Sequence, residues 1–475
     1  MLFNSIAFFV FLPTVFILYW FVFKKHLKAQ NLLVLVSSYV FYGWWDYRFL
    51  ALIVASTLVD YGIGLALSHE TRKKRRKLFL MCSLVFNIGL LGFFKYFNFF
   101  IESWVEAWGA LGVEMHSSSL NIILPVGISF YTFQTLSYTI DVYRNKIKPT
   151  NKLVEFAAYV SFFPQLVAGP IERAAQLLPQ FQKKRMFDYE LAKSGVHLII
   201  WGLFKKVVVA DNCAFFVNQI FEQPTGYSTA ELWAGAVLFG IQIYGDFSGY
   251  SDIAIGTGRL FGFRLMTNFA FPYYSRNIAE FWRRWHISLS TWFRDYLYIP
   301  LGGSRGSKAQ QIRNVFIIFL VSGFWHGANW TFLVWGGIHA LLFLPLLLGN
   351  KNRNYLARDA FKLRQLGSIG ITFLLVTIAW VFFRADTVSI AFSYIKDMVL
   401  WSDAGLGFFY KTNKYLLLSL IIGFSVLVML GFEWMAVRRQ QVEVSLSPVK
   451  AVFVILLIVL MGAFKDPAEF IYFQF

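Results

Sequence analysis

The sequence has few charged residues and almost no cysteine. Charged side chains make up 15% of the 475 residues, against about a quarter in an ordinary soluble domain, and 57% of the residues are hydrophobic. A soluble protein of this length would need a polar surface that this composition does not supply. The two cysteines, Cys82 and Cys213, form neither a metal-ligand set nor a disulfide framework. These shortages exclude an ordinary soluble domain and a cysteine-based metal site.

Signature motifs of several common protein classes are also missing. The chain has no G-x-x-x-x-G-K-[ST] phosphate loop, no G-x-G-x-x-G that opens a helix after a strand, and no H-E-x-x-H. ATP-driven transport and zinc hydrolysis therefore lose support. We expect no metal and no tightly bound cofactor.

Apolar residues gather in long blocks without charge. Residues 1–23 and 314–350 contain no Asp, Glu, Lys or Arg. A membrane-spanning helix needs about 20 such residues, so the first block fits one span and the second holds more than one. The first block also lacks a basic leader region and a cleavage site, which indicates a retained span. The sequence therefore predicts an all-α integral membrane protein.

The net charge of +18 comes largely from short basic clusters between the apolar blocks. Such clusters are typical of cytoplasmic loops under the positive-inside rule, whereas nucleic-acid binding needs a basic stripe on one exposed face. We therefore expect membrane lipids, and no nucleic acid, as partners. The clusters lie at residues 24–28, 72–77, 146–152, 183–185, 351–364 and 438–439.

A consistent topology follows when these clusters are placed in the cytoplasm. Prolines and glycine interrupt residues 162–181, which favours a re-entrant segment there. We predict about ten or eleven spans, with both termini outside, in a single polytopic domain of residues 1–475. Its core would cover about residues 120–385, with peripheral spans in 1–119 and 386–475. The clearest spans are near residues 1–23, 31–45, 49–67, 78–100, 122–142, 366–383, 415–434 and 449–464.

His326 is the leading candidate for chemistry. It lies inside the charge-free block, 13 residues beyond Arg313, which is roughly 20 Å along a helix and hence deep in a bilayer. An ionisable group at that depth is costly and indicates a functional site. The alternative is a neutral histidine that hydrogen-bonds across helices. A neutral imidazole is also what a general base requires.

His286 follows two arginines, Arg283 and Arg284, in an aromatic stretch. Trp282, His286, Leu289 and Phe293 fall on one stripe of a continuous helix, which predicts an amphipathic helix at the membrane interface. Two interpretations stay open. The helix is an anchor without chemistry, or its basic face attracts the phosphates of an acyl-carrying cofactor.

Two acids, Asp246 and Asp252, lie in another apolar stretch and need partners. Arg259 and Arg264 are near in sequence, and structural pairing and lining of a site are both open. The same ambiguity applies to Arg173 and to the lysine pair at residues 205–206. The glycines that follow favour tight helix packing; they are Gly256, Gly258 and Gly262.

Together these segments resemble the membrane-bound O-acyltransferase (MBOAT) family, and within it the bacterial, AlgI-like branch that acts in alginate O-acetylation. The resemblance rests on the order and spacing of short motifs, such as Trp325-His326-Gly327. The matching stretches are residues 42–45, 124–131, 162–171, 202–206, 246–252, 281–286, 292–296, 325–327 and 382–385.

The resemblance implies a funnel-like fold in which acyl groups from a cytoplasmic donor, acetyl-CoA, reach a hydroxyl of an exported polysaccharide. His326 corresponds to the family's membrane-embedded histidine and His286 to its second recurrent one. Trp325 and Asn329, beside His326, are expected with the arginines to position the donor or acceptor. The resemblance also implies a Gram-negative inner membrane and a separate periplasmic acetyltransferase of the SGNH type as partner.

Other acceptors and other functions compete with this interpretation. Peptidoglycan or teichoic acid could replace alginate within the same family. A transporter would also explain buried His and Asp residues among broken helices. A scaffold that recruits the periplasmic transferase is a further alternative.

Overall fold

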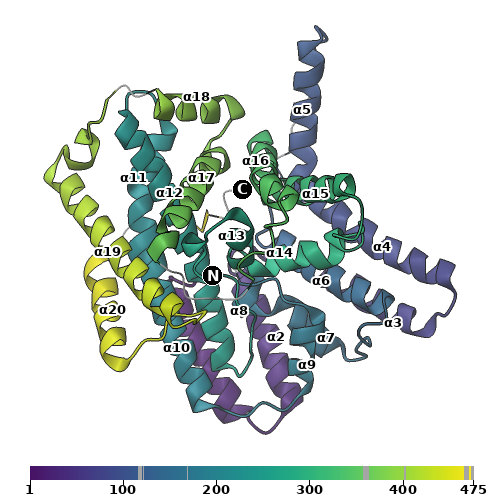
Figure 1. The fold of residues 1–475 in the computed structure, drawn as a ribbon. Helices are drawn as coiled ribbons and strands as arrows, with labels where there is room; N and C mark the ends of the chain where they lie inside the picture. The colour runs from purple at the N-terminus through teal and green to yellow at the C-terminus, as the bar shows by residue number, and fades with distance from the viewer. Residues whose placement is uncertain are drawn as a thin grey trace. The chain divides into compact units, whose positions relative to one another are not determined.

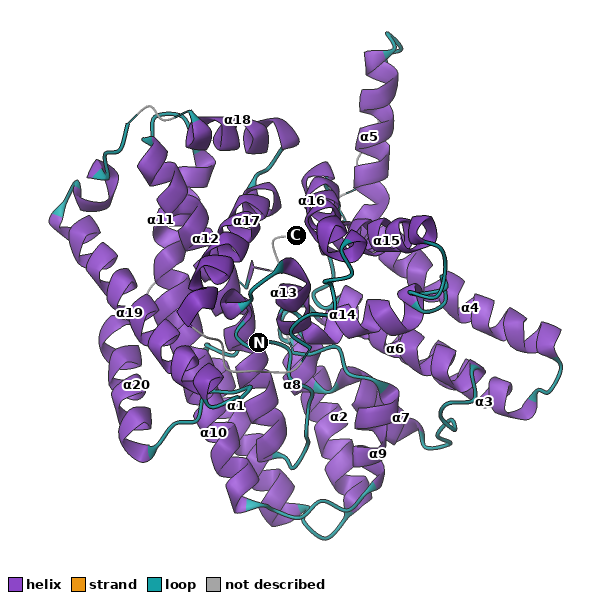
Figure 2. Ribbon diagram, viewed as in Figure 1, coloured by secondary structure: helices purple, strands orange, loops and turns teal. Residues whose placement is uncertain are grey.

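The computed structural model is built of helices joined by loops (Figure 2). It describes residues 1–115, 120, 122–167, 169–356, 363–400, 403–464 and 470–471. These residues contain no strand, so the predicted all-α class is confirmed. The chain divides into two compact units, one of Met1–Ala192 with Thr257–Leu265 and the other of Lys193–Gly256 with Met266–Phe475.

The first unit contains the N-terminal helices (Figure 1). Several are interrupted by π-helical or 3₁₀ turns, labelled η. Its elements are α1 (Ile6–Ile17), η1 (Leu18–Val22), α2 (Leu27–Gly43), η2 (Tyr47–Phe49), α3 (Leu50–His69), α4 (Lys73–Leu91), η3 (Gly92–Tyr96), α5 (Phe97–Ala110), α6 (Ile128–Tyr143), α7 (Leu153–Ser161), α8 (Phe163–Leu166) and α9 (Ala174–Gln182).

The second unit contains the C-terminal helices and both candidate histidines. Two long helices, α10 (Tyr189–Leu203) and α12 (Thr229–Leu260), begin in one unit and end in the other. The remaining elements are η4 (Phe204–Ala210), α11 (Asp211–Glu222), η5 (Pro272–Tyr274), α13 (Ile278–Arg284), α14 (Ile287–Phe293), η6 (Arg294–Tyr298), α15 (Lys308–His326), α16 (Trp330–Leu348), η7 (Leu363–Gln365), α17 (Leu366–Arg384), α18 (Val388–Val399), η8 (Gly407–Tyr410), α19 (Asn413–Arg438) and α20 (Pro448–Met461).

Five stretches of the described chain are long and apolar enough to cross a membrane. They are Tyr47–His69, Lys73–Ala110, Trp330–Leu348, Leu366–Arg384 and Asn413–Arg438, and shorter apolar helices occupy Ile6–Val22, Leu153–Leu166 and Pro448–Met461. The predicted span at residues 78–100 is longer than expected, because its basic flank forms the first turn of α4 and α5 continues it. In the predicted re-entrant segment, the structure has two short helices, α8 and α9, instead of a plain span.

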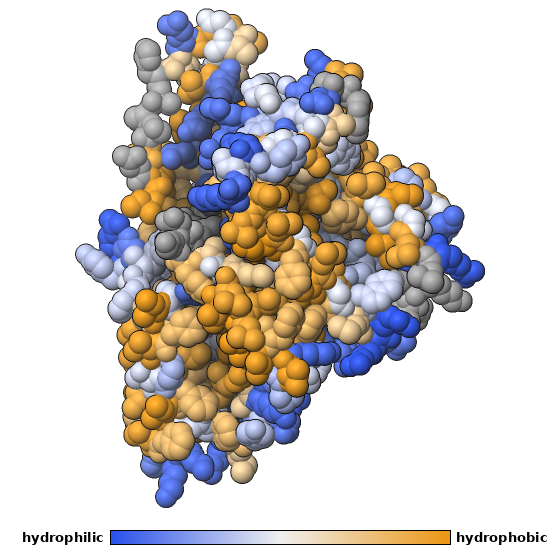
Figure 3. Space-filling model, turned by 90° about the vertical axis from the view of Figure 1, so that its left-hand side faces the viewer, coloured by the Kyte–Doolittle hydropathy of each residue, from blue (hydrophilic) through white to orange (hydrophobic). Residues whose placement is uncertain are grey.

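The side that carries α19 and α20 has the surface of a protein that contacts lipid. Figure 3 shows a broad area of hydrophobic side chains on this side, with hydrophilic residues above and below it. Leucine, valine and isoleucine side chains on both helices are exposed, which would be unfavourable in water and is favourable against acyl chains. They include Leu416, Leu417, Leu420, Leu427, Val449, Val452, Leu456, Val459 and Leu460.

A buried polar cluster joins α3, α4 and α6 in the first unit. Asp60 accepts hydrogen bonds from Asn87 Nδ2 at 2.8 Å, from Thr139 Oγ1 at 3.0 Å and from the Ser83 hydroxyl. Ser56 Oγ donates in turn to Asn87 Oδ1 at 2.8 Å. Polar side chains that hydrogen-bond across helices hold apolar spans in register, and these satisfy the buried carboxylate with neutral donors.

Close packing in the second unit depends on glycines, as the sequence predicted for Gly256. A Cβ at Gly202 on α10 would lie 2.5 Å from the carbonyl oxygen of Gly249 on α12, and a Cβ at Gly256 would overlap the carbonyl oxygen of Gly195. Only glycine lets the two backbones approach this closely. The contact positions the stretch of α12 that reaches the histidines.

Candidate active site

His326 is the last residue of α15, and the end of that helix is dictated locally. Ser307 and Gln310 form a capping box at the start of α15. At the other end Gly327 has extended backbone, and a Cβ there would overlap the ring of Phe332. Asn329 then caps α16 by accepting a hydrogen bond from the Thr331 amide at 3.0 Å. The W-H-G motif therefore places His326 at a tight corner between two helices.

Aromatic rings enclose the His326 imidazole, which is 2% exposed. Its ring centroid is 4.9 Å from that of Trp325, 5.1 Å from Trp335 on α16 and 5.4 Å from Phe383 on α17. The centroid of His286 lies 6.4 Å away. The structure thus brings together the two histidines that the sequence singled out, although 39 residues separate them.

The predicted continuous helix through His286 is wrong. Helix α13 ends at Arg284, α14 begins at Ile287, and His286 between them has the left-handed conformation, with φ 42° and ψ 55°. The Ile287 amide donates to the main-chain oxygen of Asn268 at 2.8 Å, a long-range bond that helical periodicity does not contain. Trp282 and His286 therefore do not share one helical stripe, and the His286 side chain is fully buried in the protein.

Neutral partners surround His286. Its Nδ1 lies 3.1 Å from Asn268 Oδ1, and its ring contacts Phe247 at 4.7 Å and Trp325 at 5.9 Å between centroids. Burial lowers the pKa of His286 from the ordinary value of 6.5 to about 3. The imidazole is therefore neutral at physiological pH, as a hydrogen-bond acceptor or a base must be.

Asp246 and Asp252 pair with the two lysines of η4. Lys206 Nζ lies 2.9 Å from Asp246 Oδ1 and 2.8 Å from Asp211 Oδ1, and Lys205 Nζ lies 2.8 Å from Asp252 Oδ2. The Ile471 amide also donates to Asp246 Oδ2 at 2.7 Å. The sequence left structural pairing and lining of a site open for these acids, and the ion pairs favour the structural role.

Replacement of Lys206 by methionine is expected to destabilise the protein by about 3–5 kcal/mol, because two buried carboxylates lose their cation. The side chains of Lys206, Asp211 and Asp246 are 1–3% exposed, so water cannot replace the partner. Thermal unfolding in detergent measures the change. Lys205→Met is the control with a smaller expected loss, because Asp252 is 18% exposed. A Lys206→Met protein with wild-type stability and no activity would contradict the structural role.

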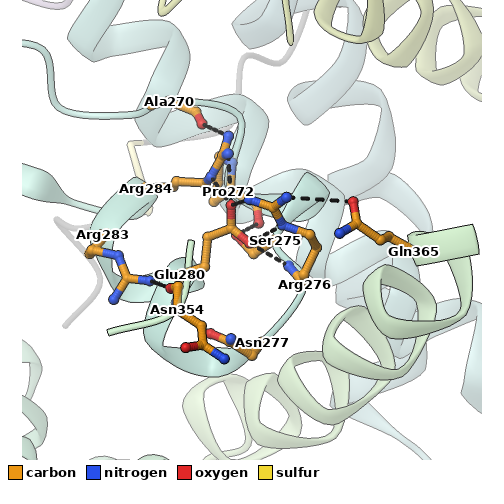
Figure 4. Close-up of polar contacts among 10 residues, drawn as sticks. All are labelled: Ala270, Pro272, Ser275, Arg276, Asn277, Glu280, Arg283, Arg284, Asn354 and Gln365. Carbon is orange, nitrogen blue, oxygen red and sulfur yellow. Dashed lines mark hydrogen bonds and ion pairs between the residues drawn. The ribbon is translucent and has the colours of Figure 1, made fainter. Parts of the chain in front are cut away.

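The two arginines before His286 have different surroundings (Figure 4). Arg284 Nη2 lies 2.8 Å from Glu280 Oε1, and Arg276 Nη2 lies 2.9 Å from the same oxygen. Burial raises the pKa of Glu280, but hydrogen bonds from Arg276 and the charge of Arg284 outweigh it and hold that pKa below its ordinary value. Arg284 therefore belongs to a permanent ion-pair network.

Arg283 points the other way and lines a cavity of about 310 Å³ in the second unit. Its guanidinium donates to the carbonyl oxygens of Asn352 at 3.0 Å and Asn354 at 2.7 Å. Arg294 and Arg353 also line the cavity, and Ser322, one helical turn before His326, reaches it from α15. The apolar part of the lining includes Leu289, Phe293, Val315, Ile318, Phe319 and Phe343.

Asn329 and Arg173 are two further residues that the sequence predicted for the site. Asn329 Nδ2 donates to the Asp386 carbonyl oxygen at 2.9 Å, so its polar groups serve the corner after His326. Arg173 is buried in the first unit, just before α9, and its role in binding stays a prediction. Asn268 and His339 were not predicted from the sequence. His339 accepts from Trp282 Nε1 at 3.3 Å, and the rule that flagged His326, a histidine inside an apolar span, would have found it.

The model of the MBOAT, membrane-bound O-acyltransferase family, matches residues 145–385, which include both histidines and the cavity lining. The match covers half of the chain. The chain belongs to this family. It is thus a multi-pass membrane protein and an O-acyltransferase, and membership favours catalysis over the transporter and scaffold alternatives.

Similar proteins support the membership over most of the chain. The chain is 41% identical to the probable alginate O-acetylase AlgI of Pseudomonas aeruginosa, over 92% of this chain and 82% of the relative. It is 37% identical to the peptidoglycan O-acetyltransferase of Helicobacter pylori, over 84% and 80%. It is 29% identical to the teichoic acid D-alanyltransferase of Bacillus subtilis, over 48% of this chain and 60% of the relative. The MBOAT, AlgI-like resemblance is confirmed.

Proposed function

We propose that this MBOAT protein transfers acetyl groups from acetyl-CoA, supplied from the cytoplasm, to hydroxyls of an exported polysaccharide. The observation that carries the proposal is the pair of buried histidines, 6.4 Å apart between centroids. A cavity rimmed by arginines reaches the helical turn before one of them. Alginate is the favoured polysaccharide, because the AlgI relatives cover most of the chain.

His326 acts as the general base in this proposal. It takes the proton of the acceptor hydroxyl while that oxygen attacks the thioester carbonyl. The tetrahedral intermediate then expels the thiolate, the carbon–sulfur bond breaks, and the imidazolium returns the proton to sulfur. The products are an O-acetyl ester and free coenzyme A, with no net proton gained or lost. The surrounding Trp325, Trp335 and Phe383 exclude water that would hydrolyse the thioester.

The arginine-lined cavity suits the proposed donor. Guanidinium groups bind phosphates well, and the apolar lining of the cavity suits the narrow phosphopantetheine chain of coenzyme A. Arg283, Arg294 and Arg353 supply the charge, and Ser322 marks the inner end near His326. Positioning of the donor by Arg283 is retained from the sequence prediction. Arg284 supports it only by holding α13 through Glu280.

The test uses inverted inner-membrane vesicles from a deletion strain that carries either the wild-type protein or Ser322→Phe, supplied with acetyl-labelled acetyl-CoA. We expect label in the exported polysaccharide with the wild type and a loss of at least about tenfold with Ser322→Phe, because a displaced donor reacts poorly. Val321→Phe is the matched control, since Val321 is exposed on the same helix. It is expected to retain transfer.

Two outcomes would contradict the proposal. Wild-type vesicles that label no glycan from acetyl-CoA would overturn the donor assignment. Equal transfer by wild type and Ser322→Phe would overturn the route through the cavity. The labelled fraction also separates alginate from peptidoglycan, the second candidate, which the similarity to the Helicobacter pylori protein favours. A periplasmic SGNH-type partner is a further part of the proposal, tested by its co-purification with the wild type.

A further inference from the structure

Asn268 makes four side-chain contacts around His286, and each is short. Its Oδ1 accepts from Ser288 Oγ at 2.8 Å and from the Ser288 amide at 3.2 Å, and it lies 3.1 Å from His286 Nδ1. Its Nδ2 donates to Ser251 Oγ on α12 at 3.1 Å. Asn268 and Ser288 are fully buried. One amide thus joins α12, the break between α13 and α14, and the candidate catalytic histidine.

These contacts determine which way the amide points. A backbone N–H only donates hydrogen bonds, so the atom that faces the Ser288 amide must be the oxygen of Asn268. The same oxygen faces His286 Nδ1. An amide oxygen only accepts, so a hydrogen bond there requires the proton of the neutral imidazole to be on Nδ1. The lone pair of His286 is then on Nε2.

We infer that Asn268 is a positioning residue of the transferase, which holds His286 as the Nδ1–H tautomer and so keeps the lone pair of that ring on Nε2. This inference rests on the proposed function, in which the two buried histidines form the reaction centre and His326 takes the hydroxyl proton. In the opposite tautomer, His286 would present an N–H at Nε2 instead of a lone pair. Asn268 therefore decides whether His286 accepts or donates at the reaction centre.

The backbone contacts give Asn268 a second effect on the same ring. The left-handed conformation of His286 is uncommon for a residue with a side chain and needs support from its surroundings. The Asn268 carbonyl oxygen holds the Ile287 amide at 2.8 Å, and its side chain holds Ser288. A test must separate this support of the backbone from the choice of tautomer.

Three variants make that separation. Asn268→Asp keeps an acceptor for His286 and for both donors of Ser288, loses the donor to Ser251, and introduces a buried carboxylate. Asn268→Leu keeps the size of the side chain and the main-chain bond to Ile287, but removes every side-chain hydrogen bond. Ser251→Ala is the control, because it removes the Nδ2 contact and leaves the contacts of Asn268 Oδ1 in place. All are compared at matched membrane abundance, and the thermal midpoint of each variant is measured.

The readouts are transfer from acetyl-CoA to glycan, resolved into kcat and KM, and ¹⁵N solid-state NMR of histidine-labelled protein. His286→Gln identifies the resonance of His286. We expect Asn268→Leu to lower kcat about 10- to 100-fold, by analogy with residues that orient metal-bound histidines, with KM for acetyl-CoA unchanged. Asn268→Asp is expected to restore most of kcat, and the wild type is expected to show a protonated Nδ1.

The possible failures are distinguishable. Unchanged kcat in Asn268→Leu, or a wild-type His286 that carries its proton on Nε2, would overturn the inference and leave the proposed function intact. Equal loss in Asn268→Leu and Asn268→Asp with a lowered thermal midpoint would show a purely structural role and would also overturn it. Full transfer by a His326→Ala protein would instead refute the proposed function.

Discussion

Replacing His326 by alanine is expected to lower acyl transfer about 10²–10⁴-fold, the usual contribution of a general base. The double variant His326→Ala with His286→Ala is expected to lose no more than His326→Ala alone. Residues that act as one unit are strongly non-additive, and the two rings lie 6.4 Å apart between centroids inside one aromatic enclosure. Once the base is gone, orienting the hydroxyl brings little further benefit.

The measurement is ester-linked acetate on envelope glycans of a deletion strain that carries each variant at equal membrane abundance. His339→Gln is the matched control for loss of a buried imidazole, because glutamine can still accept the hydrogen bond from Trp282. It is expected to retain most of the transfer. Normal acetate with His326→Ala would show that the histidine is structural. Additive losses in the double variant would mean that the histidines act in separate steps.

Replacing Gly336 by alanine is expected to cost about 1–3 kcal/mol of stability, the usual penalty for overpacking, and most of the activity. A Cβ at Gly336 on α16 would overlap the carbonyl oxygen of Phe319 on α15. A Cβ at Gly323 on α15 would likewise overlap the carbonyl oxygen of Phe332. The backbones of α15 and α16 are thus in contact at two places, so the clash must move α15 and with it His326.

The neighbouring glycine supplies the control. Gly337 is also inside α16, but a Cβ there meets nothing within 4 Å. Gly337→Ala makes the same change in helix propensity, which favours alanine by about 1 kcal/mol, without the clash. Thermal midpoint in detergent and acetate transfer should both fall for Gly336→Ala and stay at or above wild type for Gly337→Ala. Equal behaviour of the two variants would show that the close approach of α15 and α16 is not needed.

The enclosure around the histidines gives these effects a common cause. Trp335 contacts His326 and His339, at 5.1 and 4.8 Å between centroids, and stacks on Trp380 of α17 at 5.7 Å. Large rings in contact on three helices leave little freedom for any one of them, because protein interiors are close-packed. Small shifts of the backbone therefore move the imidazoles as well. For this reason the methyl group that Gly336→Ala adds on α16 should affect catalysis.

Local chemistry explains which parts of the site the sequence predicted. His326 was found because an ionisable group in a charge-free span is costly whatever the fold. Gly256 was found because small residues in apolar helices let backbones approach, and Gly195 is its partner. The sequence predicted that Asp246 and Asp252 have partners, because buried charges need them. That Lys206 and Lys205 supply these pairs depends on the fold and could not be predicted.

The sequence by itself determined that this protein is an all-α membrane protein of the MBOAT family, with His326 and His286 as its foremost candidates. Composition, charge placement and motif order carry that information, because a bilayer constrains every residue that crosses it. Only the tertiary structure decided that the helix before His286 breaks, that Arg284 is tied to Glu280, and that Asn268 holds the second histidine. Those outcomes depend on contacts between residues far apart in the chain, which helical periodicity does not encode.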